Sequence, residues 1–234
     1  ANNVQRGFVA MGLFKDQQDV EMSPTQFGTV RPGDIKYRDI NGDGKITDDD
    51  KVPLFAYSGV PQLMYGIGAE FRWTLNVLFK GTGRNKFLYG GSDGRNFDGY
   101  MPFNQKDKGN IMTIAYNPEN RWISAEYSGN QATENPNARF PRLYYGKNEN
   151  NTKPSTFWMG DARYLRLQEL SLAYNLKVPA LQRILGINSM NIQLMCENLA
   201  VWDSVNIFDP EQATSCGQAY PLPARYSLQL YLNF

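Results

Sequence analysis

The C-terminal segment 224–234 alternates strictly between two kinds of side chain, and this pattern constrains the fold more than any other feature of the chain. Every second residue is large and apolar, whereas the residues between them are mostly polar. A period of two with one apolar face is typical of a half-buried β-strand. A wholly apolar face opposite a polar face suits a strand with lipid outside and water inside. The side chains expected to face lipid are Tyr226, Leu228, Leu230, Leu232 and Phe234.

Four earlier segments alternate in the same way, so the sequence predicts an all-β fold. The pair Leu165 and Leu167 is out of phase with the apolar residues that follow, which predicts a β-bulge near Gln168. The connection at Trp73 is very short and predicts a hairpin. The five expected strands lie near residues 64–73, 74–83, 164–177, 189–200 and 224–234.

The links between these strands alternate between short and long. Short links lie at Trp73 and at 178–188, where 179–185 is expected to form a helical turn or two, and long links run from about 84 to 162 and from 202 to 223. Outer-membrane barrels have short periplasmic turns and long outside loops. Five strands cannot close a barrel, because two open edges would leave backbone groups unpaired in lipid. We therefore expect the remaining strands elsewhere, and the start at Ala1, with no Met or signal peptide, agrees with a processed chain or a part of one.

Composition agrees with a strand-rich protein and excludes some partners. Aromatic residues make up 13% of the 234 residues and glycine contributes 21, which favours strands and turns over helices. The 24 basic and 23 acidic residues form no basic field, so no nucleic-acid partner is expected. No apolar run is long enough for a transmembrane helix. Two cysteines, Cys196 and Cys216, are too few for a disulfide framework and are expected as unpaired thiols.

Residues 39–50 match the twelve-residue calcium loop, in which clustered oxygen ligands surround a hard cation. Gly44 permits the sharp turn at the sixth position, and the twelfth position holds an aspartate where a glutamate is usual. Pro53 follows the loop and the residues before it look extended, so a structural calcium in a β or coil setting is expected, not an EF-hand. The alternative is an acidic turn without an ion. The expected ligands are Asp39, Asn41, Asp43, Lys45 (through its carbonyl), Thr47 and Asp50.

No catalytic constellation is evident, so we do not expect an enzyme. Residues 90–94 match G-x-S-x-G, but the chain has no histidine and cannot build a Ser-His-Asp triad. A hydrolase would need a pair of carboxylates, and no spacing singles one out. The region 89–158 mixes aromatic residues with Asn, Gly and Asp, which suits sugar stacking, peptide binding or packing against a partner. The sequence identifies no individual substrate-binding residue.

Several blocks, taken in order, resemble the SusC/RagA family of TonB-dependent outer-membrane transporters. Each block is modest, but their order is specific and covers nearly the whole chain. They are Pro32 to Asp39 followed by Asn41-Gly42-Asp43-Gly44, the Tyr65-Gly66 strand start with the hairpin through Gly81, Phe157 to Leu167, Glu197-Asn198-Leu199, Asp209-Pro210-Glu211, Tyr220-Pro221-Leu222-Pro223, and the terminal Phe234.

The resemblance implies a transmembrane β-barrel of about 22 strands with long extracellular loops, of which this chain holds the last five. It implies an extracellular loop region at 1–62 and the barrel strands with their loops at 63–234. It implies a multi-pass protein of the bacterial outer membrane that imports oligosaccharides or peptides with a SusD-like lipoprotein lid. The plug and the segment that contacts TonB would lie in the remaining N-terminal part of the transporter.

A different class of protein also fits part of the pattern. In a soluble, calcium-stabilised β carbohydrate-binding module, the apolar faces of the five strands would pack against each other as a sandwich core. The aromatic loops would then bind sugar. The two hypotheses differ in whether the apolar side chains of the strands are buried between sheets or face outward.

Overall fold

The computed structural model describes residues 4–56, 62–71, 75–89, 111, 113–145, 148–177, 179–215 and 220–234. The chain divides into two compact units. The first comprises Ala1–Gly59, Phe87–Gly160 and Thr214–Cys216, and the second comprises Val60–Lys86, Asp161–Ala213 and Gly217–Phe234. No helix within the described residues is long and apolar enough to cross a membrane.

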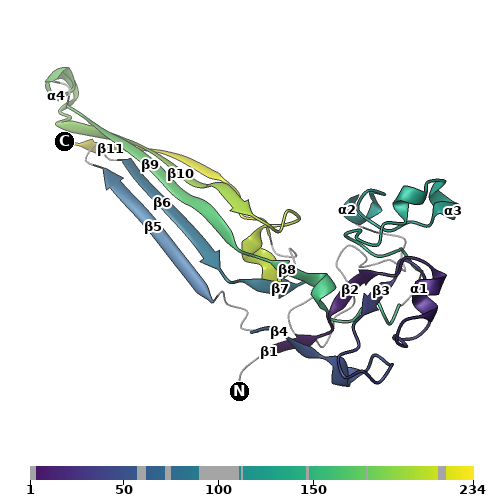
Figure 1. The fold of residues 1–234 in the computed structure, drawn as a ribbon. Helices are drawn as coiled ribbons and strands as arrows, with labels where there is room; N and C mark the ends of the chain where they lie inside the picture. The colour runs from purple at the N-terminus through teal and green to yellow at the C-terminus, as the bar shows by residue number, and fades with distance from the viewer. Residues whose placement is uncertain are drawn as a thin grey trace. The chain divides into compact units, whose positions relative to one another are not determined.

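The first unit is built from short elements joined by long irregular segments (Figure 1). Its strands pair in antiparallel fashion, β1 with β4 and β2 with β3. Aromatic residues fill its core, among them Phe8, Phe14, Tyr37 and Trp158. The elements are β1 (Val4–Gly7), β2 (Ala10–Leu13), α1 (Gln17–Glu21), β3 (Ile35–Tyr37), η1 (Asp48–Asp50), β4 (Val52–Ala56), α2 (Thr113–Tyr116), α3 (Ala125–Ser128), η4 (Gln131–Thr133) and η5 (Thr156–Trp158).

The second unit is dominated by one antiparallel sheet of five long strands, in the order β11-β10-β9-β6-β5 (Figure 1). The short strands β7 and β8 pair separately with each other. The elements of this unit are β5 (Leu63–Phe71), β6 (Leu75–Gly83), β9 (Tyr164–Leu176), α4 (Pro179–Leu185), β10 (Ser189–Asp203), η6 (Pro210–Ser215) and β11 (Arg225–Asn233). The boundary between the units falls within β7 (Lys86–Leu88) and β8 (Met159–Asp161), and two residues of each belong to the first unit.

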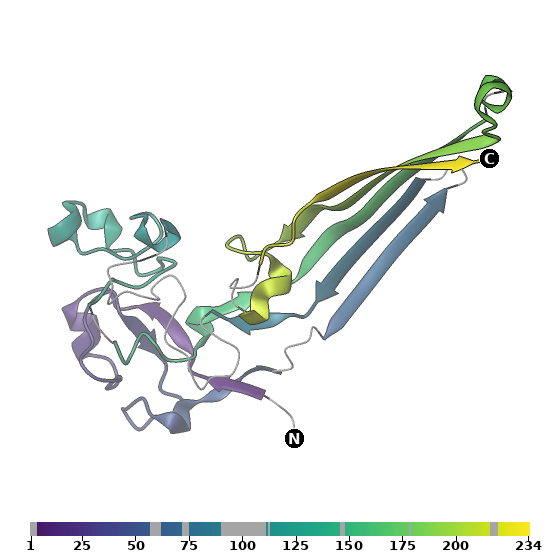
Figure 2. The same cartoon turned by 180° about the vertical axis from the view of Figure 1, so that it is seen from behind.

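The short links gather at one end of the five-stranded sheet. Phe71 pairs with Leu75 across the hairpin, and Leu75 pairs in turn with Leu172 of β9. At the same end α4 joins β9 to β10, and the backbone N–H of Asn188 donates to the carbonyl of Asn233 beside the C-terminus. The η6 turn, yellow-green in Figure 2, lies at the opposite end of the sheet from α4. Short links and long links therefore leave the sheet at opposite ends.

The five predicted strands are confirmed, and so is the all-β fold class. Their bounds match within a few residues, although β10 continues to Asp203, past the expected end at 200. The bulge near Gln168 is also confirmed, because Leu78 pairs with Glu169 and Phe79 pairs with Leu167, which leaves Gln168 without an opposite residue. The expected helical turn at 179–185 is α4.

The N-terminal region contains more strand than its sequence indicates. Segments of three to five residues, such as β1 and β3, are too short to show a periodic pattern. The sequence separates 1–62 from the rest of the chain, whereas the structure places Ala1–Gly59 in one unit with Phe87–Gly160. Contacts such as the hydrogen bond from the Phe8 N–H to the Pro154 carbonyl, 2.9 Å long, make that connection.

Candidate functional site: a two-faced sheet

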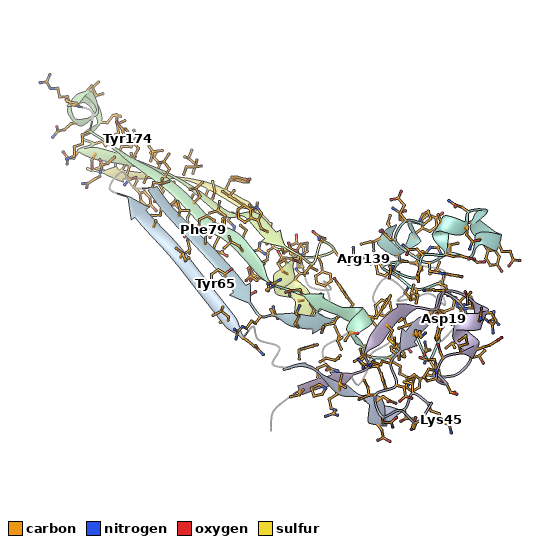
Figure 3. The ribbon with its side chains drawn as sticks, in the orientation of Figure 1. Asp19, Lys45, Tyr65, Phe79, Arg139 and Tyr174 are labelled. Atoms are coloured by element: carbon orange, nitrogen blue, oxygen red, sulfur yellow. The ribbon has the colours of Figure 1, made fainter. Side chains whose placement is uncertain are left out.

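The strand register places most large apolar side chains of the sheet on one face. Tyr226 pairs with Cys196, which pairs with Leu170, and Leu170 pairs with Val77. The same face therefore runs unbroken through β11, β10, β9 and β6, and Val77 extends it to Ala69 of β5. Tyr65, Phe79 and Tyr174, labelled in Figure 3, belong to this apolar face by their register. A row of apolar residues on each of five paired strands makes one continuous surface.

This apolar face lies open. Leu228 is 75% exposed, and exposed apolar side chains occur on this face at Ile67, Leu172, Leu194 and Trp202 as well. All five side chains predicted to face lipid are exposed, with exposed fractions of 42% to 75% for Tyr226, Leu228, Leu230, Leu232 and Phe234. Within the described residues, therefore, no second sheet covers this face. A sandwich would need such a second sheet to form its core.

The opposite face of the same strands is polar. Asn76 donates through Nδ2 to the Ser171 hydroxyl at 3.3 Å, and Glu197 lies 3.4 Å from Arg225 on the neighbouring strand. Asn175 and Asn191 are paired across β9 and β10, followed by Ala173 opposite Gln193. The register also places some large apolar or aromatic residues on this face, namely Met64, Leu78, Tyr164, Met195, Val201 and Tyr231.

A four-residue ion network occupies the polar face next to η6. Arg166 is opposite Lys80 in the register, and like charges in that position repel. Two acidic residues offset the repulsion: Arg166 donates to Asp209 at 2.6 Å, and Lys80 donates to Glu211 at 2.7 Å. The Nε of Arg166 also lies 2.9 Å from Glu211. Arg166 is only 2% exposed, so these carboxylates replace the water that its guanidinium group has lost.

The predicted calcium loop is a tightly hydrogen-bonded turn in the first unit. Asp39 accepts the Gly42 N–H at 2.7 Å and the Gly44 N–H at 2.8 Å, one on each carboxylate oxygen. Asn41 accepts the Asp43 N–H at 3.0 Å, and Asp43 accepts the Lys45 N–H at 2.9 Å. These bonds follow from the spacing of acceptors along the loop. Gly44, at φ +81°, has the left-handed conformation that the sharp turn needs.

The two ends of this loop meet at Asp50. Its carboxylate is fully buried and accepts the N–H groups of Ile40 and Thr47, both at 2.8 Å. Thr47 and Asp50 form a capping box at the start of η1. Burial alone would raise the pKa of Asp50, but the backbone hydrogen bonds and the side chain of Asp39 hold that pKa below its ordinary value.

The donor set of the loop suits a hard cation in its chemistry. The oxygens of Asp39 and Asp43 each accept a single N–H in the bonds above, and a carboxylate oxygen has a second lone pair. The described residues contain no group of three or more His, Cys, Asp or Glu side chains arranged to hold a metal. Any ion here would therefore need the Asn41 amide oxygen and backbone carbonyls beside the carboxylates, as calcium loops use.

Sequence and fold comparisons agree with this geometry. No protein-family model matches the chain. The chain is 28% identical over 205 residues to TonB-dependent receptor P26 of Formosa agariphila, covering 88% of this chain and 19% of that protein. A solved structure of the RagAB peptide transporter superposes on 100% of this chain and 23% of its own, with a TM-score of 0.59 at 18% identity. The RagAB peptide importer in its 'open-open' state gives a TM-score of 0.58 at 17% identity, covering 99% of this chain and 22% of its own.

The resemblance to SusC/RagA-type TonB-dependent transporters is confirmed. This SusC/RagA-like chain spans about a fifth of the length of the relatives it matches. Those relatives are named as receptors and transporters, not as enzymes. The fold that they share with this chain includes the five-stranded antiparallel sheet, so the chain has the fold of a barrel segment.

Sequence reasoning missed one of the fully buried polar groups of the described residues, the carboxylate of Asp34. Asp34 is fully buried and accepts the Arg31 N–H at 2.8 Å, the Asn151 side-chain amide at 2.8 Å and the Asn148 side-chain amide at 3.1 Å. Arg142 lies 2.9 Å from the same carboxylate. Asp34 lies in the block 32–39 that carried the family resemblance, but its side-chain partners Arg142, Asn148 and Asn151 are more than a hundred residues away along the chain.

The structure also bears on the two cysteines, the G-x-S-x-G match and the blocks that carried the resemblance. Cys196 is a free, buried thiol on the apolar face of the sheet, whereas Cys216 lies outside the described residues. The G-x-S-x-G match at 90–94 also lies outside them. The network of Arg166, Asp209 and Glu211 joins two of the resemblance blocks, and the sequence did not predict this contact.

Proposed function

We propose that this chain forms part of a TonB-dependent importer in the bacterial outer membrane, where its sheet is a segment of the barrel wall. The observation that carries the proposal is the open apolar face that the register extends over all five strands, with a polar face behind it. In a bilayer the apolar face lies against lipid and the polar face lines a wet interior.

The edges of the sheet support a larger barrel. Strands β5 and β11 each pair on one side only within the described residues. Unpaired strand edges are unfavourable in lipid, where no water replaces the missing hydrogen bonds. Further strands of the same transporter would pair with β5 and β11 and close the wall, making the protein multi-pass.

The proposed substrates are oligosaccharides or peptides, captured beneath a SusD-like surface lipoprotein. Solved structures with this fold are described as a peptide transporter and a peptide importer. These descriptions support the proposal that the protein imports a nutrient. Energy coupling through TonB and the plug belongs to the remaining part of the transporter. The chain itself supplies wall strands and outside loops, and no catalytic role is proposed for it.

The function is tested with the full-length protein in a strain that lacks its own copy. With Cys196 and Cys216 replaced by serine, single cysteines are introduced at Leu228 and Gln229 and labelled with a fluorophore. Brominated lipids are expected to quench the label at Leu228 and to leave the label at Gln229 bright. Equal quenching at both positions, or recovery of the protein in the soluble fraction, would contradict the proposal. Loss of labelled oligosaccharide or peptide uptake in the deletion strain tests import itself.

We also propose that calcium occupies the loop 39–50 and rigidifies it, with Asp39, Asn41, Asp43 and Asp50 as side-chain ligands, Thr47 acting through water and Lys45 through its carbonyl. The support is the spacing of oxygen donors and the close approach of the two loop ends at Asp50. Five aspartates and one lysine lie in this loop, so a bound cation would relieve repulsion among the carboxylates.

Calcium binding is tested by thermal unfolding of the full-length protein with and without the ion. Calcium at a hundredfold excess over its Kd is expected to stabilise the loop's unit by about 2.7 kcal/mol. The matched variant is Asp43→Asn, which keeps an acceptor for the Lys45 N–H and removes one charge. If calcium leaves the wild-type transition unchanged, the ion site is absent and the loop is an acidic turn.

A further inference from the structure

The link between β9 and β10 is longer than two neighbouring antiparallel strands need. It runs over residues 177–188 and contains the helix α4 (Pro179–Leu185), whereas the other short link is the hairpin between Phe71 and Leu75. Figure 2 shows α4 beyond the end of the sheet, beside the C-terminus. Because a turn of two residues can join antiparallel strands, the additional residues of this link are available for another role.

Two large apolar side chains of α4 are exposed. Ile184 is 78% exposed and Leu185 is 58% exposed, and they follow each other at the end of the helix. Ile187, just after the helix, is instead covered by the protein, with an exposed fraction of 8%. The free energy cost of leaving Ile184 and Leu185 in water is removed where another apolar surface covers them.

The charged side chains near α4 are all positive. Lys177 and Arg183 are the only charged residues in the segment 170–196, and the C-terminal strand has no charged side chain after Arg225. Both cations are exposed, and neither forms an ion pair with any described residue. Exposed apolar residues next to cations without acidic partners are typical of segments that lie in a membrane interface.

Two exposed aromatic residues mark the ends of the apolar face of the sheet. Tyr174, labelled in Figure 3, is 62% exposed near α4, and Trp202 is 54% exposed near the opposite end. Tyr174 pairs with Ile192, and β10 runs about 33 Å from Ile192 to Trp202 at about 3.3 Å per residue. At a strand tilt of about 40° this length spans about 25 Å along the membrane normal, which is the height of the apolar band between the aromatic girdles of membrane barrels.

The same measure puts α4 at the level of the lipid headgroups. β10 begins at Ser189, which lies about 10 Å along the strand beyond Ile192 and about 8 Å beyond it along the membrane normal. The headgroup layer occupies about 5–8 Å on each side of the hydrocarbon core. At this depth apolar side chains reach the boundary of the acyl chains, while the long side chains of lysine and arginine reach the phosphates.

We propose that α4 anchors the protein in the phospholipid leaflet at the short-link end of the sheet. Ile184 and Leu185 insert at the acyl boundary, and Lys177 and Arg183 bind the phosphates of anionic phospholipids through charge-assisted hydrogen bonds. This inference rests on the proposed function, because it needs the apolar face of the sheet to lie in lipid. It goes beyond that function by giving a lipid-binding role to a link outside the barrel wall.

The experiment uses the full-length protein, with Cys196 and Cys216 replaced by serine, in vesicles with the same lipids in both leaflets. The variants Ile184→Cys and Gln182→Cys are each labelled with bimane. Gln182 is the control, because two residues along a helix turn a side chain by about 200°, to the opposite side. Lipids brominated near the headgroup are expected to quench the label at Ile184 at least about threefold more strongly than the label at Gln182. Aqueous iodide should quench the two labels in the reverse order.

The role of the cations is tested by comparing brominated phosphatidylglycerol with brominated phosphatidylcholine at the same mole fraction. Phosphatidylglycerol is expected to be enriched about fivefold around the label at Ile184, because each cation favours an anionic surface by about that factor. The double variant Lys177→Gln/Arg183→Gln should remove the enrichment. The matched control Lys15→Gln/Arg139→Gln removes the same charge from exposed residues of the first unit. Heat-modifiable migration on gels verifies that each variant assembles.

Three outcomes would overturn the inference: a label at Ile184 quenched by lipid no more than the label at Gln182, equal quenching by the two brominated lipids, or unchanged enrichment in Lys177→Gln/Arg183→Gln. Protection of Ile184 from both lipid and iodide is a form of the first outcome and would mean that protein covers α4. The label at Leu228 separates these failures from a failure of the proposed function, since a barrel without an anchoring α4 still has Leu228 in lipid.

Discussion

The two units of the chain bury opposite kinds of residue. In the first unit the core is aromatic, with Phe8, Phe14, Tyr37 and Trp158 almost fully buried. In the sheet of the second unit, Arg166 and Ser171 are buried together with Tyr164 and Cys196, whereas several tyrosines and leucines along the strands are exposed. The first unit follows the usual arrangement for a protein surrounded by water.

This difference supports the proposal that the two units are folded for different surroundings. Apolar burial stabilises the first unit, while its buried polar group Asp34 is fully hydrogen-bonded. Within the described residues the sheet has no such core of its own, because most apolar side chains lie on an open face and the polar side chains lie beside each other on the opposite face. A lipid phase on one side and further strands at both edges would supply what the sheet lacks.

The largest effect should come from removing the buried carboxylate of the first unit. Asp34→Ala leaves Arg142 and two asparagine amides without their acceptor, and we expect a loss of about 3–5 kcal/mol. Hydrogen exchange of backbone amides in segments 31–36 and 148–152 of the full-length protein measures it. Asp19→Ala is the control, because its pair with Lys36 is partly exposed and should contribute about 1 kcal/mol or less. Similar effects from the two variants would remove the contrast between a buried and an accessible charge.

A charge placed on the apolar face of the sheet should lower the stability of the protein nearly as much as Asp34→Ala does. Leu228→Arg places a cation where lipid is expected, and we predict a loss of about 2–4 kcal/mol in the assembled protein. Gln229→Arg, one residue along β11 on the polar face, should change stability by less than about 1 kcal/mol. Urea titration of the protein in lipid vesicles measures both. A larger effect at Gln229 than at Leu228 would reverse the assignment of the two faces.

The ion network beside η6 should show an intermediate effect. Arg166→Met removes the partner of Asp209 and one partner of Glu211, and we expect local stability to fall by about 1.5–3 kcal/mol. Faster hydrogen exchange across 204–215 would report it. The control Lys80→Met removes a more exposed charge, which should contribute about 1 kcal/mol or less. Unchanged exchange in Arg166→Met would mean that η6 is held by other contacts.

The smallest effect should come from the cap at Asp50. Its pKa is lower in the folded protein than the ordinary value of 3.8, so its contribution is fully present above that value and is lost as the pH falls through the lower, folded pKa. Asp50→Asn should cost about 1 kcal/mol at pH 7 and should reduce the loss of stability on acidification. Thermal unfolding at pH 7, 5 and 3 compares the two proteins. If the unfolding temperature falls by the same amount with pH in the wild type and in the variant, the acid sensitivity comes from groups other than Asp50.

Much of the sheet could be predicted from the sequence because its signals are local. Alternation in 224–234 fixes which side chains share a face, and a strand needs no distant information to show it. The phase change between Leu167 and Leu170 identifies the bulge at Gln168 in the same way, and the structure confirms it. The oxygen spacing of 39–50 likewise predicts a calcium site, and that prediction awaits its own test.

The parts that escaped prediction depend on contacts between distant residues. Asp34 meets Arg142 and Asn151 across more than a hundred residues, and Arg166 meets Asp209 across 43. No repeat marks such pairs, because each partner is a single polar residue whose position follows no pattern shared with the other.

The sequence by itself determined the five strands, their two faces and the short links at one end, because backbone pleating makes side chains alternate wherever a strand forms. Only the tertiary structure decided which strands pair and which charges neutralise each other. These features depend on contacts between residues that are far apart in the sequence. The free energy that favours such contacts is the sum of many weak interactions, and no short segment contains all of the residues involved.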